Sequence, residues 1–122
     1  MAKTSDNPVR EISVEEFDEM IENHDDLLIV DVREAGEFRR GHIPGARLLP
    51  HGLLQGAVDD ARRLQTQQLL GGRHKTLVLC SRDGSGCAVA ADRLRQLGFE
   101  KVYNLAGGIA RWQAQGYALV TD

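Results

Sequence analysis

Apolar runs alternate with amphipathic segments along the chain, and this alternation predicts strands and helices in turn. The runs at 27–32 and 77–80 have no polar alternation, which is typical of parallel strands covered on both faces. The predicted strands lie at residues 11–12, 27–32, 48–49, 77–80 and 101–103. Helical spacing of apolar residues predicts helices at 13–24, 58–69 and 88–97, and the segment 104–109 is predicted to turn into a last helix through residue 112. The pattern predicts an α/β fold, with a central parallel sheet of about five strands and helices on both faces.

Local signals place the ends of these elements. Ser13 and Glu16 are spaced as a capping box, so the first helix begins there and ends near residues 23–24. Gly98 is a natural stop for the helix over 88–97. The polar segment 1–10 is predicted to be a flexible N-terminal tail, and 11–122 a single domain. The core is predicted to include Ile29, Val30, Leu77, Val78, Leu79, Leu94 and Leu97.

Composition narrows the classes of function. A net charge of -3 shows no basic excess, so neither nucleic acid nor a membrane is expected as a partner. The first residues lack the apolar centre of a signal peptide, and no apolar run reaches the spanning length, so we expect a cytoplasmic protein. The 2 cysteines cannot make a disulfide framework and are not paired with nearby histidines. We expect no metal and no cofactor.

The segment that joins the buried strand 77–80 to the next helix has the composition of an anion-binding loop. Gly84 and Gly86 let the backbone curl, so that successive N–H groups and the positive end of the helix can converge. Residues 81–87 are therefore predicted to form a closed loop around a small oxyanion. Arg82 adds a positive charge, which the neighbouring Asp83 is expected to cancel, and Ser85 completes the loop.

This segment resembles the active-site loop of the rhodanese family. Residues 76–97 align without a gap to the family segment, whose loop usually reads Cys-Arg-x-Gly-x-Arg before a helix. Arg82 and Gly84 match, but Ser81 stands at the position of the nucleophilic cysteine and Gly86 at that of the last arginine. Both residues most closely tied to the chemistry therefore differ from the family pattern.

Two further motifs extend the resemblance from about residue 12 to residue 117. Asp31 and Arg33 match the family's Asp-x-Arg at the end of a strand, and His42 belongs to a matching Gly-His-Ile-Pro-Gly-Ala over 41–46. Near the C-terminus, residues 107–109 read Gly-Gly-Ile with Trp112 three positions on, as in the family. We expect Asp31, Arg33 and His42 to be structural, because such side chains tie neighbouring loops together.

The resemblance implies a sulfurtransferase, which takes a sulfur atom from a donor such as thiosulfate and holds it on a cysteine as a persulfide. The sulfur then passes to an acceptor, such as the thiol of another protein. Ser81 cannot replace that cysteine, because a hydroxyl is a poor nucleophile without an adjacent base. Cys87, at the start of a helix, is one alternative nucleophile, since this position lowers a thiol's pKa. Cys80 is another, although strand alternation places it opposite Leu79, inside the layer between sheet and helices.

Three classes of function therefore stay open at this point. The chain is a sulfurtransferase that uses Cys87 or Cys80, a catalytically silent rhodanese-like module that binds a partner or an anion, or a relative of the phosphatases and arsenate reductases. Proteins of the last class resemble one another in a Cys-x5-Arg loop. If Cys80 is the cysteine of such a loop, Gly86 occupies the position of the arginine. A phosphoryl group would lose its bidentate clamp there, which makes this the weakest of the three.

Overall fold

The structure is a computed structural model and describes residues 10–23, 26–49, 75–85, 91–92, 94–95 and 98–121. The predicted helix over 58–69 lies outside the described residues, as do Gly86, Cys87 and Leu97. Within these ranges no helix has both the length and the apolar character to cross a bilayer.

A five-stranded parallel sheet forms the centre of the molecule, in the order β1-β5-β4-β2-β3. The strands are β1 (Arg10–Ile12), β2 (Leu27–Asp31), β3 (Arg47–Leu48), β4 (Thr76–Cys80) and β5 (Lys101–Leu105). Each neighbouring pair is parallel, with Asp31 beside Cys80 and Leu79 beside Asn104 in the register. The predicted α/β fold with a central parallel sheet is confirmed, and β1 begins one residue before the predicted boundary of the tail.

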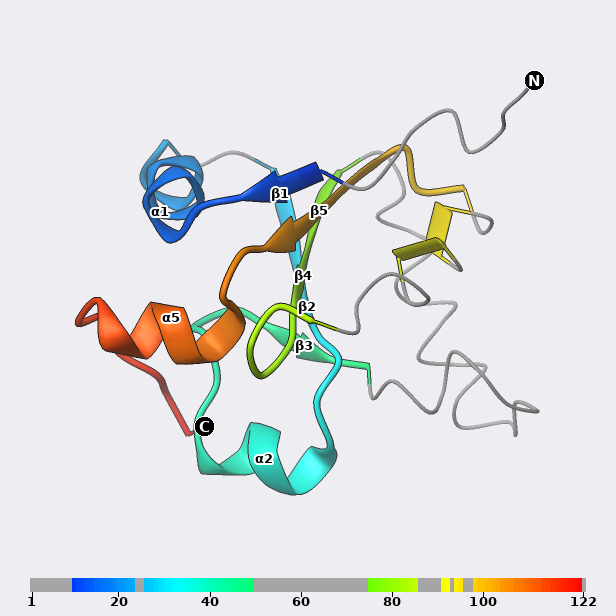
Figure 1. Cartoon of the computed structure of the whole chain (residues 1–122). Helices are drawn as coiled ribbons and strands as arrows, with labels where there is room; N and C mark the ends of the chain where they lie inside the picture. The colour runs from blue at the N-terminus through cyan, green and yellow to red at the C-terminus, as the bar shows by residue number, and fades with distance from the viewer. Residues whose placement is uncertain are drawn as a thin grey trace.

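Helices lie on both faces of this sheet (Figure 1). Two of them, α1 (Val14–Glu22) and α5 (Gly108–Ala114), lie on one face, and the helical residues 91–92 and 94–95 lie on the other. The third, α2 (Ala35–Arg40), lies beyond the end of the sheet and connects β2 to β3. The helix α2 thus lies next to the carboxyl end of β2.

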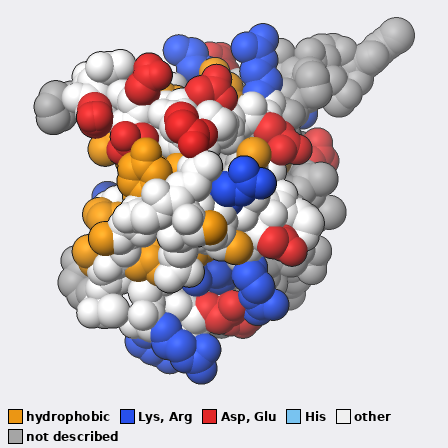
Figure 2. All heavy atoms as spheres, turned by 60° about the vertical axis from the view of Figure 1, so that its left-hand side comes forward, with side chains coloured by type: hydrophobic (Ala, Val, Ile, Leu, Met, Phe, Trp, Pro, Cys, Tyr) orange, Lys and Arg blue, Asp and Glu red, His pale blue; other side chains and the backbone are white. Residues whose placement is uncertain are grey.

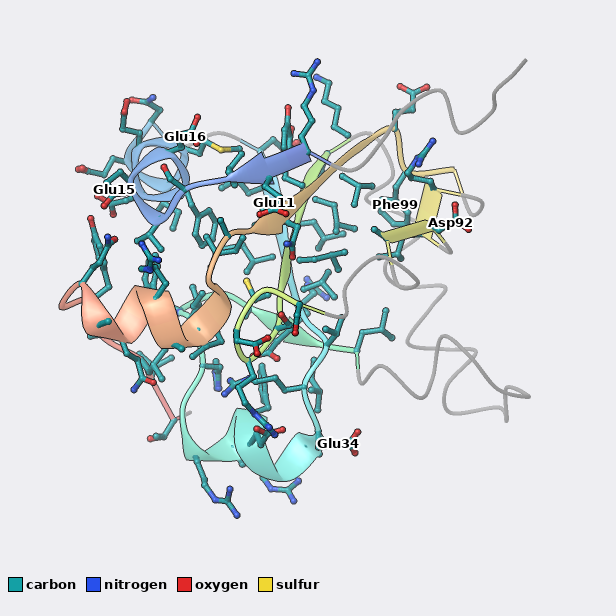
Figure 3. The ribbon with its side chains drawn as sticks, viewed as in Figure 1. Glu11, Glu15, Glu16, Glu34, Asp92 and Phe99 are labelled. Atoms are coloured by element: carbon teal, nitrogen blue, oxygen red, sulfur yellow. The ribbon has the colours of Figure 1, made fainter. Side chains whose placement is uncertain are left out.

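Side-chain alternation along the strands divides the core into two layers. Leu77 and Leu79 belong to a layer that also contains Leu94 and Phe99, the last of which is labelled in Figure 3. Val78 and Cys80 point into the opposite layer, which contains Phe17 and Trp112. Burial of one large apolar side chain stabilises the fold by about 1.5–3 kcal/mol. The predicted core is confirmed for each of its members that the structure describes.

The first helix begins at the predicted capping box. The Glu16 N–H donates to Ser13 Oγ at 3.0 Å, and the Ser13 N–H donates to Glu16 Oε1 at 2.8 Å. These bonds satisfy donors that a helix start otherwise leaves unpaired. Acidic side chains gather over the upper part of the molecule, where α1 lies, and basic ones lie both at the top edge and at the bottom (Figure 2). In α1 the acidic residues are Glu15, Glu16, Asp18, Glu19 and Glu22.

The last strand is longer than the sequence pattern predicted. We expected it to end at Tyr103 and Asn104 to begin a turn, whereas β5 continues to Leu105. The Ala106 N–H donates to the Ile12 carbonyl at 2.9 Å, so pairing with β1 carries the strand onward. Asn104 is consequently a strand residue and is only 6% exposed.

Candidate functional site

The candidate site lies where β2 and β4 end side by side. Because the two strands are parallel neighbours, the segments that follow them meet at one edge of the sheet, where ligands of open α/β sheets commonly bind. A shallow pocket of about 280 Å³ opens there. Its lining comes from both segments and from α2, and comprises Val32, Arg33, Glu34, Glu37, Ser81, Arg82 and Ser85.

Asp31 and Arg33 form a buried ion pair beneath this pocket. Arg33 Nη2 donates to Asp31 Oδ2 at 2.8 Å and to the Gly41 carbonyl at 2.7 Å. The Arg33 backbone N–H donates to Asp31 Oδ1 at 2.9 Å. The Asp31 side chain is 0% exposed and that of Arg33 9%. The pair therefore ties the end of β2 to the loop after α2.

His42 joins the same loop to the C-terminal segment. Its backbone exchanges two hydrogen bonds of 2.8 Å with Val120. The imidazole Nδ1 lies 2.8 Å from the Phe38 carbonyl oxygen, and the ring stacks on Phe38 with centroids 3.8 Å apart. His42 is 3% exposed and is not among the residues that line the pocket. These contacts are those of a residue that holds loops together.

Ser81 begins the loop and lies largely buried at the pocket, with 8% exposure. Its Oγ accepts a hydrogen bond of 2.9 Å from the Gly84 backbone N–H. Farther along, Asp83 Oδ1 accepts bonds from the Ser85 N–H at 3.0 Å and the Ser85 hydroxyl at 2.6 Å. The bond from the Ser85 hydroxyl lowers the pKa of Asp83 below its ordinary value.

These internal bonds change the expectation of an anion cradle. The amides of Gly84 and Ser85 donate to oxygen atoms of the loop itself, so in this arrangement they are not directed at a ligand. The sequence predicted inward-pointing amides over the whole of 81–87. Since 86–87 lie outside the described residues, the closed loop and its bound oxyanion stay a prediction.

The loop is fastened to the start of α5. The N–H groups of Ile109 and Ala110 donate to the carbonyl oxygens of Ser81 and Arg82 at 2.8 and 2.9 Å. The approach requires glycine at position 108, where φ is 59° and an added Cβ would lie 2.6 Å from the Gly84 nitrogen. Residues 107–108 of the Gly-Gly-Ile motif thus place α5 against the loop.

Asn104 supports the loop from below. Its Nδ2 donates to the Gly84 carbonyl oxygen at 2.9 Å, which links β5 to the loop after β4. Asn104 Oδ1 is buried and, among the described residues, has no hydrogen-bond partner. Burying Oδ1 without a partner costs stability. The side chain is nevertheless held in place by the bond from Nδ2 to Gly84, which gives Asn104 a role in positioning the loop.

Arg82 points to α2 and not into the loop. Its Nε and Nη2 donate to Glu37 Oε2 at 2.9 and 2.7 Å. The side chains are 76% and 24% exposed, respectively. The hydrogen bond from Arg82 lowers the pKa of Glu37. The carboxylate in direct contact with the guanidinium is therefore that of Glu37, while the charge of Arg82 also contributes to the lowered pKa of the neighbouring Asp83.

The structure describes one of the two cysteines, Cys80. Cys80 is 0% exposed and packs in the layer opposite Leu79, as predicted from strand alternation. Cys80 is also absent from the residues that line the pocket. Cys87 and Gly86 lie outside the described residues, so the proximity of Cys87 to the pocket stays a prediction.

Sequence reasoning missed two contributors to the site. The sequence pattern predicted no role for Glu37 and placed Asn104 in a turn. Both act through contacts between residues far apart in the chain, and local patterns do not reveal such contacts.

In the described part of the chain, no three His, Cys, Asp or Glu side chains gather as metal ligands.

Comparison with known protein families identifies the family of this chain. Residues 13–115 match the rhodanese-like domain. The chain belongs to the rhodanese-like domain family. Among solved structures, a rhodanese-related protein from Thermoplasma volcanium superposes with a TM-score of 0.71 at 26% identity, covering 93% of this chain and 99% of that one.

Curated relatives include proteins of known and unknown activity. The uncharacterized protein YibN of Escherichia coli is 33% identical over 80% of this chain and 64% of its own length. A sulfurtransferase of Allochromatium vinosum is 30% identical over 92% of this chain and 95% of its own length. The chain thus spans less than two thirds of YibN but nearly all of the second relative, and it is related to sulfurtransferases.

Proposed function

We propose that this rhodanese-like domain is a binding module that does not carry sulfur on residue 81. The observation that supports this most directly is the state of Ser81. At the position that the resemblance assigns to the nucleophile, the side chain presents a hydroxyl oxygen that accepts the Gly84 N–H. A hydroxyl is a weak nucleophile unless a neighbouring base removes its proton.

The remaining described groups at the pocket do not supply that base. Two described carboxylates line the pocket, of which Glu37 is engaged with Arg82. The other, Glu34, makes no hydrogen bond with the Ser81 hydroxyl, whose partner among the described residues is the Gly84 N–H. The thiol of Cys80 is buried in the other layer of the core. A pocket of about 280 Å³ can hold a small ligand or one side chain of a partner protein. The proposed function is binding at this edge of the sheet without covalent sulfur transfer.

A second candidate is sulfur transfer through Cys87, favoured by the similarity to the Allochromatium vinosum sulfurtransferase. In that reaction the thiolate attacks the outer sulfur of thiosulfate, the sulfur–sulfur bond breaks, and sulfite leaves with the electron pair. The resulting persulfide then gives its outer sulfur to cyanide or to a thiol. A helix start favours the thiolate that this reaction needs.

The experiment that tests the proposal measures thiosulfate-to-cyanide transfer for the unaltered chain, Ser81→Cys and Cys87→Ser. We expect background turnover for the unaltered chain and a clear increase for Ser81→Cys. The new thiolate would accept the hydrogen bond that the Gly84 N–H now donates to the serine oxygen, and this bond stabilises the thiolate. Turnover that is present in the unaltered chain and lost in Cys87→Ser would instead support the second candidate.

A further inference from the structure

We infer that Glu37 determines the ligand specificity of the pocket, because it withholds Arg82 from oxyanions. The inference rests on the proposed binding function and names the ligand class that this pocket disfavours. Arg82 is the side chain that most naturally serves an oxyanion here, since a guanidinium can present two N–H groups to one anion. In this chain Nε and Nη2 are both directed at Glu37 Oε2.

The position of Glu37 makes it an effective competitor for Arg82. It lies in the first turn of α2 and is half-buried, whereas Arg82 is largely exposed and reaches toward it. A carboxylate held by the fold needs no binding step, so an incoming anion must displace it and then lie beside its negative charge. Nε and Nη2 of Arg82 both donate to one Glu37 oxygen, so a single substitution at residue 37 removes this competition.

The other charges at the pocket act in the same direction. Arg33 also lines the pocket, but its guanidinium is paired with the buried Asp31 carboxylate. Glu34 is exposed at the start of α2, and its side chain extends away from the ribbon (Figure 3). Asp83, next to Arg82, is exposed as well. Among the described residues that line the pocket, each arginine thus has its own carboxylate, and the charge left over is the negative one of Glu34.

The test compares oxyanion affinity by NMR titration with thiosulfate and with sulfate at constant ionic strength. We expect Glu37→Gln to bind both anions about tenfold more tightly than the unaltered chain, because the pair is lost and a repelling charge is removed. Glu34→Gln is the matched control, since it removes the same charge from the same pocket. We expect it to tighten binding no more than about twofold, because Glu34 faces solvent.

A second arm measures the effect of Arg82→Ala with and without the Glu37 carboxylate. Arg82→Ala should weaken oxyanion binding about tenfold in the Glu37→Gln background and less than twofold in the otherwise unaltered chain. Equal losses in the two backgrounds would overturn the inference, as would a Glu37→Gln protein that binds oxyanions no better than the unaltered chain. These affinities are equilibrium quantities, so they are read separately from the sulfur-transfer test of the proposed function.

Discussion

Ile109 donates its backbone N–H to the carbonyl oxygen of Ser81 at 2.8 Å, and this bond fastens the loop after β4 to the first turn of α5. The loop is therefore held from the direction of the C-terminal helix as well as from its own strand. Asn104 adds a third attachment through Gly84. The position of residue 81 depends on these contacts, whatever side chain it carries.

Gly108→Ala should loosen this attachment. The substitution places a Cβ at a positive φ of 59° and against the Gly84 nitrogen, so we expect a loss of about 2–4 kcal/mol in the free energy of unfolding. Urea denaturation measures it. Gly36→Ala in α2 is the matched control, because an added Cβ meets nothing within 4 Å there, and it should stabilise by up to about 1 kcal/mol. Similar effects of the two substitutions would contradict the attachment.

Much of the fold could be predicted from the sequence, because apolar runs and the capping box act locally. The runs that contain Val30 and Val78 became central strands, and Ser13 caps α1 as expected. Asn104 was misplaced because a polar residue near glycines is typical of a turn, whereas pairing with β1 and the bond to Gly84 retain it in β5. Glu37 was missed as a site residue because its contact with Arg82 spans 45 residues.

Breaking the buried pair of Asp31 and Arg33 should strongly destabilise the fold. Asp31→Ala leaves a buried guanidinium without its carboxylate, so we expect a loss of about 3–5 kcal/mol in the free energy of unfolding. Lys75→Ala is the control, because its pair with Asp26 at 3.5 Å is partly exposed and should contribute less than about 1 kcal/mol. Chemical denaturation of both variants decides the matter, and equal losses would refute a structural role for the buried pair.

Acidification should release Arg82 from Glu37. The folded-state pKa of Glu37 lies below the ordinary value of 4.5, so the stabilisation from this pair is fully present above pH 4.5. It is lost as the pH falls through the lowered pKa, because the carboxyl group then takes up a proton. An NMR titration of the Glu37 carboxyl carbon should give a midpoint below 4.5. Arg82→Ala should raise that midpoint, and a midpoint indifferent to Arg82 would count against the pair.

The central claim is that the unaltered chain binds at this pocket without taking up sulfur covalently, and mass spectrometry after incubation with excess thiosulfate tests it most directly. One persulfide adds about 32 Da to the residue that carries it. We expect no such adduct on the unaltered chain and a readily formed one on the new thiol of Ser81→Cys, located by peptide mapping. An adduct on Cys87 of the unaltered chain would contradict the account and identify Cys87 as the nucleophile.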